Sequence, residues 1–437
     1  MRGGDATAEA IWPRLRRNAG VILGGRAASG LINLAAAAVA VRAVGIEGFG
    51  VVALLQAYVR VLAGLLRFES WAAVTRYGPG LMASGDSDGL RRLMGFTLRL
   101  DAIAFAASVA LAAALAPVVG RWFGWPPEFA ALAPLYAVTL IFITGATPTG
   151  FLRLVDRFRV LAEQHALNAV IRLAGAGLVL ALGFGVSALV AAWAAAGILS
   201  GVYMMRAAWI EARARGLAPR WRGRWSDLAA GFPNLRRFVA LTNATAVVET
   251  VTSHAAVLIA GAVLGPAGAS LYSLARQISD ALGKLSPLLG QIILPELAGL
   301  EARGDRRTLR RVVRRTLQVS ALGLAAVMAG LWAGGEALLV LLFGPEAAAA
   351  APLLLGAGAA ASLAACGFAL GPALLSLGRE TAVFRTALVA TLVFAPLLMG
   401  LLHLNGLTGA GIALVVWQSM IFAGRLSILR AELRRGA

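Results

Sequence analysis

Long apolar segments separated by short polar ones run through the whole chain. Each apolar segment has about 20 residues, the length at which an α-helix crosses a hydrocarbon core of ~30 Å. They lie near residues 19–42, 49–69, 94–118, 130–151, 165–184 and 187–209, and then near 238–264, 269–293, 315–334, 350–375, 384–404 and 407–428. The pattern predicts an all-α polytopic membrane protein with about 12 transmembrane helices.

The composition agrees with this pattern. Hydrophobic residues make up 59% of the 437 residues and charged residues 14%, whereas soluble domains average about 45–50% and about 25%. Aromatic residues are few and there are 51 glycines, which favours closely packed transmembrane helices over the alternating strands of a membrane β-barrel. Cys366 is the only cysteine, which excludes an intrachain disulfide and a cysteine-based metal cluster.

The net charge of +19 is carried almost entirely by arginine, and Lys284 is the only lysine. So basic a chain suggests a nucleic-acid partner, but the arginines occupy alternate loops. One side of the membrane receives those within 2–17, 76–92, 153–159, 206–237, 303–315, 379–385 and 425–435. The opposite loops hold only Arg42 and Arg121.

This alternation predicts that both termini are cytoplasmic. The basic segments near 211–237 and 303–315 then face anionic headgroups, so membrane lipids are expected partners and nucleic acid is not.

Two patterns recur in the second half of the chain. Ala43-Val-Gly-Ile-Glu-Gly-Phe-Gly50 reappears as Val263-Leu-Gly-Pro-Ala-Gly-Ala-Ser270, and 84–92 matches 303–311. These matches predict a duplicated six-helix unit, and an even number of helices between the copies gives parallel repeats. The expected domains are an N-terminal six-helix bundle (1–209), a cytoplasmic basic linker (210–237) and a C-terminal six-helix bundle (238–437), with the substrate path between the bundles.

Polar side chains inside the predicted spans gather on the first, second, seventh and eighth, which are equivalent pairs under the repeat. Such groups are costly in a membrane unless they face a cavity or a partner, so they are functional candidates. They suggest a central water-filled cavity in which cations outnumber acids, which suits an anionic ligand because arginine binds phosphate oxygens bidentately. The substrate-binding candidates are Arg26, Asn33, Gln56, Arg60, Arg276, Asp280 and Lys284, and the candidates for ion coupling are Glu249 and Asp280.

Several of these positions also have a structural interpretation. Arg26 and Arg67 are expected near the cytoplasmic boundary, where a long side chain reaches the headgroups. Arg276 and Asp280 are four residues apart and so are placed to neutralise each other. Glu249 is either a proton or cation site or the counter-ion of an arginine.

Three further charged residues, Arg99, Asp101 and Arg172, are placed near the inner surface and given a structural role.

Signatures of catalysis are missing from the sequence. It has no Walker sequence, no GxSxG and no HExxH, and the outward loops are too short for a catalytic domain. The three histidines have no metal-ligand spacing. We therefore expect neither an enzyme nor a metal or cofactor site.

Several motifs resemble those of bacterial polysaccharide transporters of the Wzx type. They are Gly45-Ile-Glu-Gly-Phe-Gly50, Thr75-Arg-Tyr77 followed by Gly85-Asp86, Arg153-Leu-Val-Asp-Arg-Phe158, Gly265-Pro-Ala-Gly-Ala-Ser-Leu-Tyr-Ser-Leu-Ala-Arg276, Lys284-Leu-Ser-Pro287 and Ile293-Leu-Pro-Glu296. The resemblance covers essentially the whole chain. It places the protein in the superfamily that also contains the MATE drug exporters and the peptidoglycan-precursor flippases.

The resemblance implies a two-lobed, V-shaped transporter in the bacterial inner membrane. It would flip undecaprenyl-pyrophosphate-linked oligosaccharides of an O-antigen, capsule or exopolysaccharide by alternating access, coupled to a proton or sodium gradient or to the membrane potential. It also implies cavity arginines at Arg26 and Arg276, and partnership with a polysaccharide polymerase and a chain-length regulator.

Two alternatives remain open. One is a MATE-like exporter of a drug or another lipid, although MATE exporters usually carry a carboxylate in the first helix, where this chain has Arg26 and Asn33. The other is a membrane-embedded polysaccharide polymerase, which needs a long outward loop with catalytic residues. The longest outward connections, near 119–129 and 335–349, hold few ionisable residues.

Overall fold

The computed structural model is helical in nearly every residue that it describes. It describes residues 5–122, 133, 136–139, 146–221, 223–225, 227, 231–232, 235–283, 297, 306–377 and 379–435, with side chains left out at some of them, notably 5–27 and 240–249.

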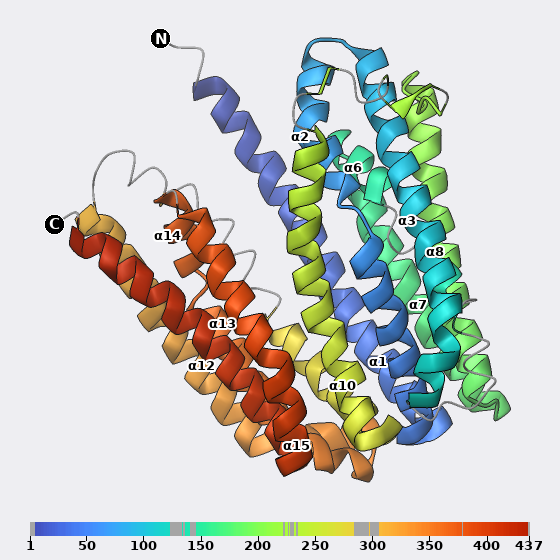
Figure 1. The fold of residues 1–437 in the computed structure, drawn as a ribbon, viewed down its shortest axis with the longest axis vertical. Coiled ribbons are helices and arrows are strands. Elements are labelled where there is room, and N and C mark those ends of the chain that lie inside the picture. The colour runs from blue at the N-terminus through green and yellow to red at the C-terminus, as the bar shows by residue number, and fades with distance from the viewer. Residues whose placement is uncertain are drawn as a thin grey trace. The chain divides into compact units, whose positions relative to one another are not determined.

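The helices follow one another along the chain without a strand in this part of the protein (Figure 1). In the first half they are α1 (Asp5–Leu66), α2 (Ser70–Ala83), α3 (Ser87–Trp122), α6 (Ala146–Leu154), α7 (Phe158–Leu182) and α8 (Val186–Ala214). In the second half they are α10 (Leu235–Gly283), α12 (Arg306–Phe343), the 3₁₀-helix η1 (Pro345–Ala350), α13 (Ala351–Cys366), α14 (Leu370–Ser376) and α15 (Glu380–Arg435). The predicted all-α class is confirmed.

Eight helices in the described ranges are long and apolar enough to cross a membrane. Three long helices are bent at a glycine with positive φ: α1 at Gly45, α10 at Gly265 and α15 at Gly406. Each bend falls between two predicted spans, so one continuous helix carries two of them. The total of about 12 spans stays a prediction.

The helix surfaces expose apolar side chains, as expected of a protein surrounded by lipid. Large apolar side chains are exposed in the interior of long helices, such as Leu322 at 75% and Leu392 at 66%. In water such side chains would be costly over so wide a surface, but hydrocarbon solvates them freely. The protein is therefore a multi-pass membrane protein.

The predicted repeat is supported by the backbone at its best-matched positions. Gly45 has φ 74° and ψ 172°, and Gly265 has φ 72° and ψ −173°. These two glycines are the third residues of the two matched octapeptides. Only glycine adopts this region without strain, so the same unusual bend recurs where the sequence repeats.

The chain folds into two compact units. Unit 1 comprises residues 1–44 and 55–254, and unit 2 comprises 45–54 and 255–437. In unit 1, α2 packs on α3 and α6, and α7 on α8, around buried residues such as Leu93, Phe151 and Met204. In unit 2, α13 packs against α12 and α15. The boundaries expected at 209 and 237 stay predictions.

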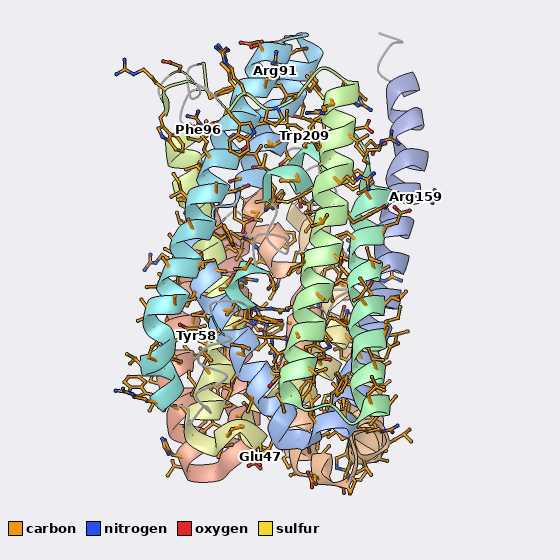
Figure 2. The ribbon with its side chains drawn as sticks, turned by 90° about the vertical axis from the view of Figure 1, so that its right-hand side faces the viewer. Glu47, Tyr58, Arg91, Phe96, Arg159 and Trp209 are labelled. Atoms are coloured by element: carbon orange, nitrogen blue, oxygen red, sulfur yellow. The ribbon has the colours of Figure 1, made fainter. Side chains whose placement is uncertain are left out.

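One end of unit 1 gathers the arginine-bearing loops. Nε of Arg91 donates to the carbonyl of Ala218 at 3.1 Å, and the amide of Arg220 donates to the carbonyl of Arg91 at 3.0 Å. Arg157 forms an ion pair with Glu211 at 2.9 Å. We call this the arginine-rich end, and Figure 2 labels Arg91, Phe96 and Trp209 there. Its cytoplasmic orientation stays a prediction.

The second predicted span, near 49–69, ends at a break in the helix and is followed by a further helix. The helix stops at Leu66, and after three non-helical residues α2 begins at Ser70 and runs for 14 residues. Arg67 therefore lies at a break between two helices, directly after a candidate membrane span that ends at Leu66. Its place near the membrane surface stays a prediction.

Replacing Gly50 with alanine should destabilise the protein. Its added Cβ would lie 1.9 Å from the carbonyl oxygen of Pro266 within unit 2, and backbone cannot yield cheaply. We expect a loss of about 1–3 kcal/mol, measured as a lower Tm of the detergent-purified protein. Gly177→Ala, where a Cβ meets nothing within 4 Å, is the matched control, and an equal Tm for both variants would contradict the contact.

Candidate functional site

Arg172 lies deep in a membrane-spanning helix. It is 14 residues after the first residue of α7, Phe158, and 10 before the last, Leu182. At 1.5 Å per residue this puts it about 21 Å and about 15 Å from the two ends. The sequence-based placement near the inner surface is wrong, because the helix begins earlier than residue 165.

The guanidinium of Arg172 is held by an aromatic side chain of the next helix. Its central carbon lies 3.7 Å from the ring centroid of Trp193 on α8. The indole Nε1 of Trp193 in turn donates to the carbonyl of Arg172 at 3.3 Å. This pair of contacts fixes the plane of the guanidinium. Its Nε is nonetheless buried and has no hydrogen-bond partner among the described residues.

Arg172 does not stand alone. Arg60 of α1 lies within Coulombic range of it, and both surround Tyr136, which is only 7% exposed. Gln56, one turn before Arg60, also faces the Tyr136 hydroxyl, with which its side chain interacts. These five residues, Gln56, Arg60, Tyr136, Arg172 and Trp193, form what we call the Arg60–Arg172 cluster.

The electrostatics of this cluster are unbalanced. Two guanidiniums repel each other most strongly where the dielectric constant is low, and no ion pair joins either one to a carboxylate in the part of the chain that the structure describes. The Nε of Arg172 is a further donor that has no partner among the described residues. The arrangement therefore has the charge and the donors that a bound anion would satisfy.

The other candidates of unit 1 lie on the first part of α1. Asn33 donates from Nδ2 to the carbonyl of Ser29 at 2.8 Å, while its Oδ1 is buried without a partner among the described residues. Arg26 belongs to the same helix, but its side chain lies outside the described residues.

In unit 2, Arg276 and Asp280 lie on successive turns of α10. They form an ion pair at 3.1 Å, with side chains 24% and 56% exposed. The spacing of four residues thus produces the mutual neutralisation considered from the sequence. Lys284 lies outside the described residues, and Glu249 lies in α10 with a side chain that the structure does not describe.

A second polar group, missed from the sequence, surrounds the break between α1 and α2. Glu69 accepts from Arg67 and from the indole of Trp71. Asp101 of α3 accepts from the amide of Thr147 at 2.9 Å and from its hydroxyl at 2.6 Å. The fully buried Ser70 lies beside the same carboxylate.

Asp101 caps a helix on another segment. Thr147 is the second residue of α6, so its amide is one of those that a helix leaves without an internal partner. A carboxylate there also interacts favourably with the positive end of the helix dipole. The contacts assign Asp101 a structural role, as expected from the sequence.

Metal binding finds no support in the described residues, where no three His, Cys, Asp or Glu side chains are grouped suitably.

The fold is that of a known class of membrane transporters. An inward-facing MATE family multidrug resistance transporter of the MOP superfamily matches with a TM-score of 0.73 at 16% identity, over 93% of this chain and 95% of that one. The lipid II flippase MurJ, in an inward closed conformation, matches with a TM-score of 0.71 at 12% identity, over 94% and 87%. At these identities the likeness shows the fold alone, and it confirms the MATE-like class.

Sequence comparison shows the family. A family model described as "Polysaccharide biosynthesis protein" matches residues 39–352, and the chain belongs to that family. It is also similar to the inner membrane protein YghQ of Escherichia coli K12, with 27% identity over 337 residues, which are 77% of this chain and 94% of that protein. These findings confirm the resemblance seen in the motifs.

Asp101→Ala should lower the stability of unit 1. The change leaves the amide and hydroxyl of Thr147 without their acceptor, at a cost of about 1–3 kcal/mol for a buried donor. A thermal-shift measurement on the purified protein checks this. Asp88→Ala, which removes a carboxylate that is 53% exposed, is the control and should change the Tm little. Equal shifts would show that Asp101 does not cap α6.

Proposed function

We propose that this protein is a flippase for undecaprenyl-pyrophosphate-linked oligosaccharide repeat units of an O-antigen, capsule or exopolysaccharide. It works in the bacterial inner membrane by alternating access. Membership of a polysaccharide biosynthesis family supports this proposal, and so does a fold shared with a lipid II flippase.

The observation that carries the proposal is the Arg60–Arg172 cluster. Two guanidiniums without a described carboxylate partner, together with the unpaired Nε of Arg172, are matched to an anion with several oxygens. Pyrophosphate has such oxygens, and arginine binds them bidentately. A cationic drug would be repelled here, which favours the flippase over a drug exporter.

The proposed substrate-binding set keeps the residues predicted from the sequence and extends it. Tyr136 and Arg172 join Gln56 and Arg60 in unit 1, with Asn33 and Arg26 on the same chain segment as further candidates. In unit 2 the candidates are Arg276, Asp280 and Lys284. Asp280, which holds Arg276, and Glu249 are the proposed coupling groups, driven by a proton or sodium gradient or by the membrane potential.

A polysaccharide polymerase and a chain-length regulator are the proposed protein partners, because the flipped repeat unit must be polymerised on the far side of the membrane. We propose that the protein moves its substrate across the membrane and does not catalyse a chemical reaction.

Arg60→Ala or Arg172→Ala should abolish or strongly reduce export. Loss of one charged hydrogen-bond donor costs about 1.5–3 kcal/mol, or about 10–100-fold in affinity. We would complement a deletion strain with each variant and score surface polysaccharide together with lipid-linked repeat units held on the cytoplasmic face. Polymer should fall and intermediates should accumulate.

The matched control is Arg159→Ala, since that side chain is 87% exposed and pairs with its neighbour Glu163 on the same helix. Expression and Tm of each variant separate a lost site from a lost fold. If polymer persists in the deletion strain while drug sensitivity rises, the protein is an exporter and the flippase proposal is wrong.

A further inference from the structure

A cavity of about 470 Å³ lies at the arginine-rich end of unit 1. Its walls come from α3, α6, α8 and the segment that follows α8, and they include Met94, Phe151, Ala208 and Trp221. It falls within the range of about 300–1,000 Å³ typical of pockets that bury a small ligand. The Arg60–Arg172 cluster contributes no residue to it.

The lining is suited to hydrocarbon. Apart from Thr147 and Arg206, every residue that lines the cavity is apolar or aromatic. Water needs two to four polar partners to occupy a buried space stably, and this cavity offers too few. An occupant that fills it must therefore be largely apolar.

Arg206 lines the cavity and has no counter-ion among the described residues. Arg206 is exposed, and within the described structure it has neither an ion pair nor a hydrogen bond. On the next turn of α8, Trp209 is 39% exposed and carries the guanidinium of Arg213, 4.8 Å from its ring centroid. Trp221 on the opposite wall is 49% exposed. Exposed tryptophans beside arginines are typical of the headgroup level of a membrane.

The size and lining of the cavity suit part of a hydrocarbon chain, and Arg206 at its wall suits an anionic headgroup.

We propose that this cavity binds one acyl chain of an anionic glycerophospholipid from the surrounding leaflet, with the lipid phosphate on Arg206. The site is built into unit 1 and does not depend on the transported substrate. The lipid completes the packing between α3, α6 and α8 where the protein leaves a void, so it stabilises the arginine-rich end in proportion to its occupancy.

The test uses the full chain purified in detergent and titrated with phosphatidylglycerol or phosphatidylcholine, with bound lipids counted by native mass spectrometry. The wild type should hold one phosphatidylglycerol tightly and prefer it to phosphatidylcholine. Ala208→Phe, which fills the cavity, should weaken that binding at least tenfold. Arg206→Gln should remove the preference for phosphatidylglycerol.

Matched controls are Ala174→Phe, on an exposed position of α7, and Arg159→Gln. Val202→Trp lines the cavity from a position that is 44% exposed, and it replaces Ala208→Phe if that variant does not fold. Equal binding by the cavity-filling and control variants would overturn the proposal, since the lipids would then only surround the protein. Displacement of the bound lipid by a polyprenyl phosphate at equal concentration would overturn it too, because the occupant would be the substrate tail.

Discussion

The absence of water from the bilayer interior decides most of this structure. Every backbone amide and carbonyl must be satisfied within the chain, so the described residues are almost all helical. The same constraint applies to charged side chains, each of which needs an ionic, aromatic or hydrogen-bonding partner. Arg172 stacks on Trp193, Arg67 pairs with Glu69, and Arg276 pairs with Asp280. The exceptions, where donors stay unpaired, are therefore the places at which a ligand is to be sought.

Interruptions of the helices follow from the same rule. At Gly45 and Gly265 the chain bends through a conformation that glycine alone tolerates. At the break after Leu66, the carboxylate of Glu69 accepts from the side chains of Arg67 and Trp71. At the start of α6, Asp101 of α3 accepts from the amide of Thr147. The contact between Asp101 and Thr147 thus replaces a missing helical hydrogen bond and ties two helices together.

Much of the fold could be predicted from the sequence, because hydrophobic length, arginine alternation and repeated glycines are local signals. The pairing of Arg276 with Asp280 was also accessible, since helical spacing determines it. Tyr136 and Trp193 were not, because they meet Arg172 from other helices and no sequence periodicity links them. Arg172 could have been recognised by counting: from the polar residues near Arg157 to the turn at Gly183, it lies midway. The predicted helix start at residue 165 placed Arg172 too close to the end of its helix.

The candidate arginines of the two units differ in whether a carboxylate pairs with them. Arg276 already has a carboxylate at 3.1 Å, so an anion that approaches it must compete with Asp280. Arg60 and Arg172 have no such described partner, and their mutual repulsion is relieved only when negative charge arrives. Binding of an anion by the Arg60–Arg172 cluster therefore costs no ion pair, while binding at Arg276 does.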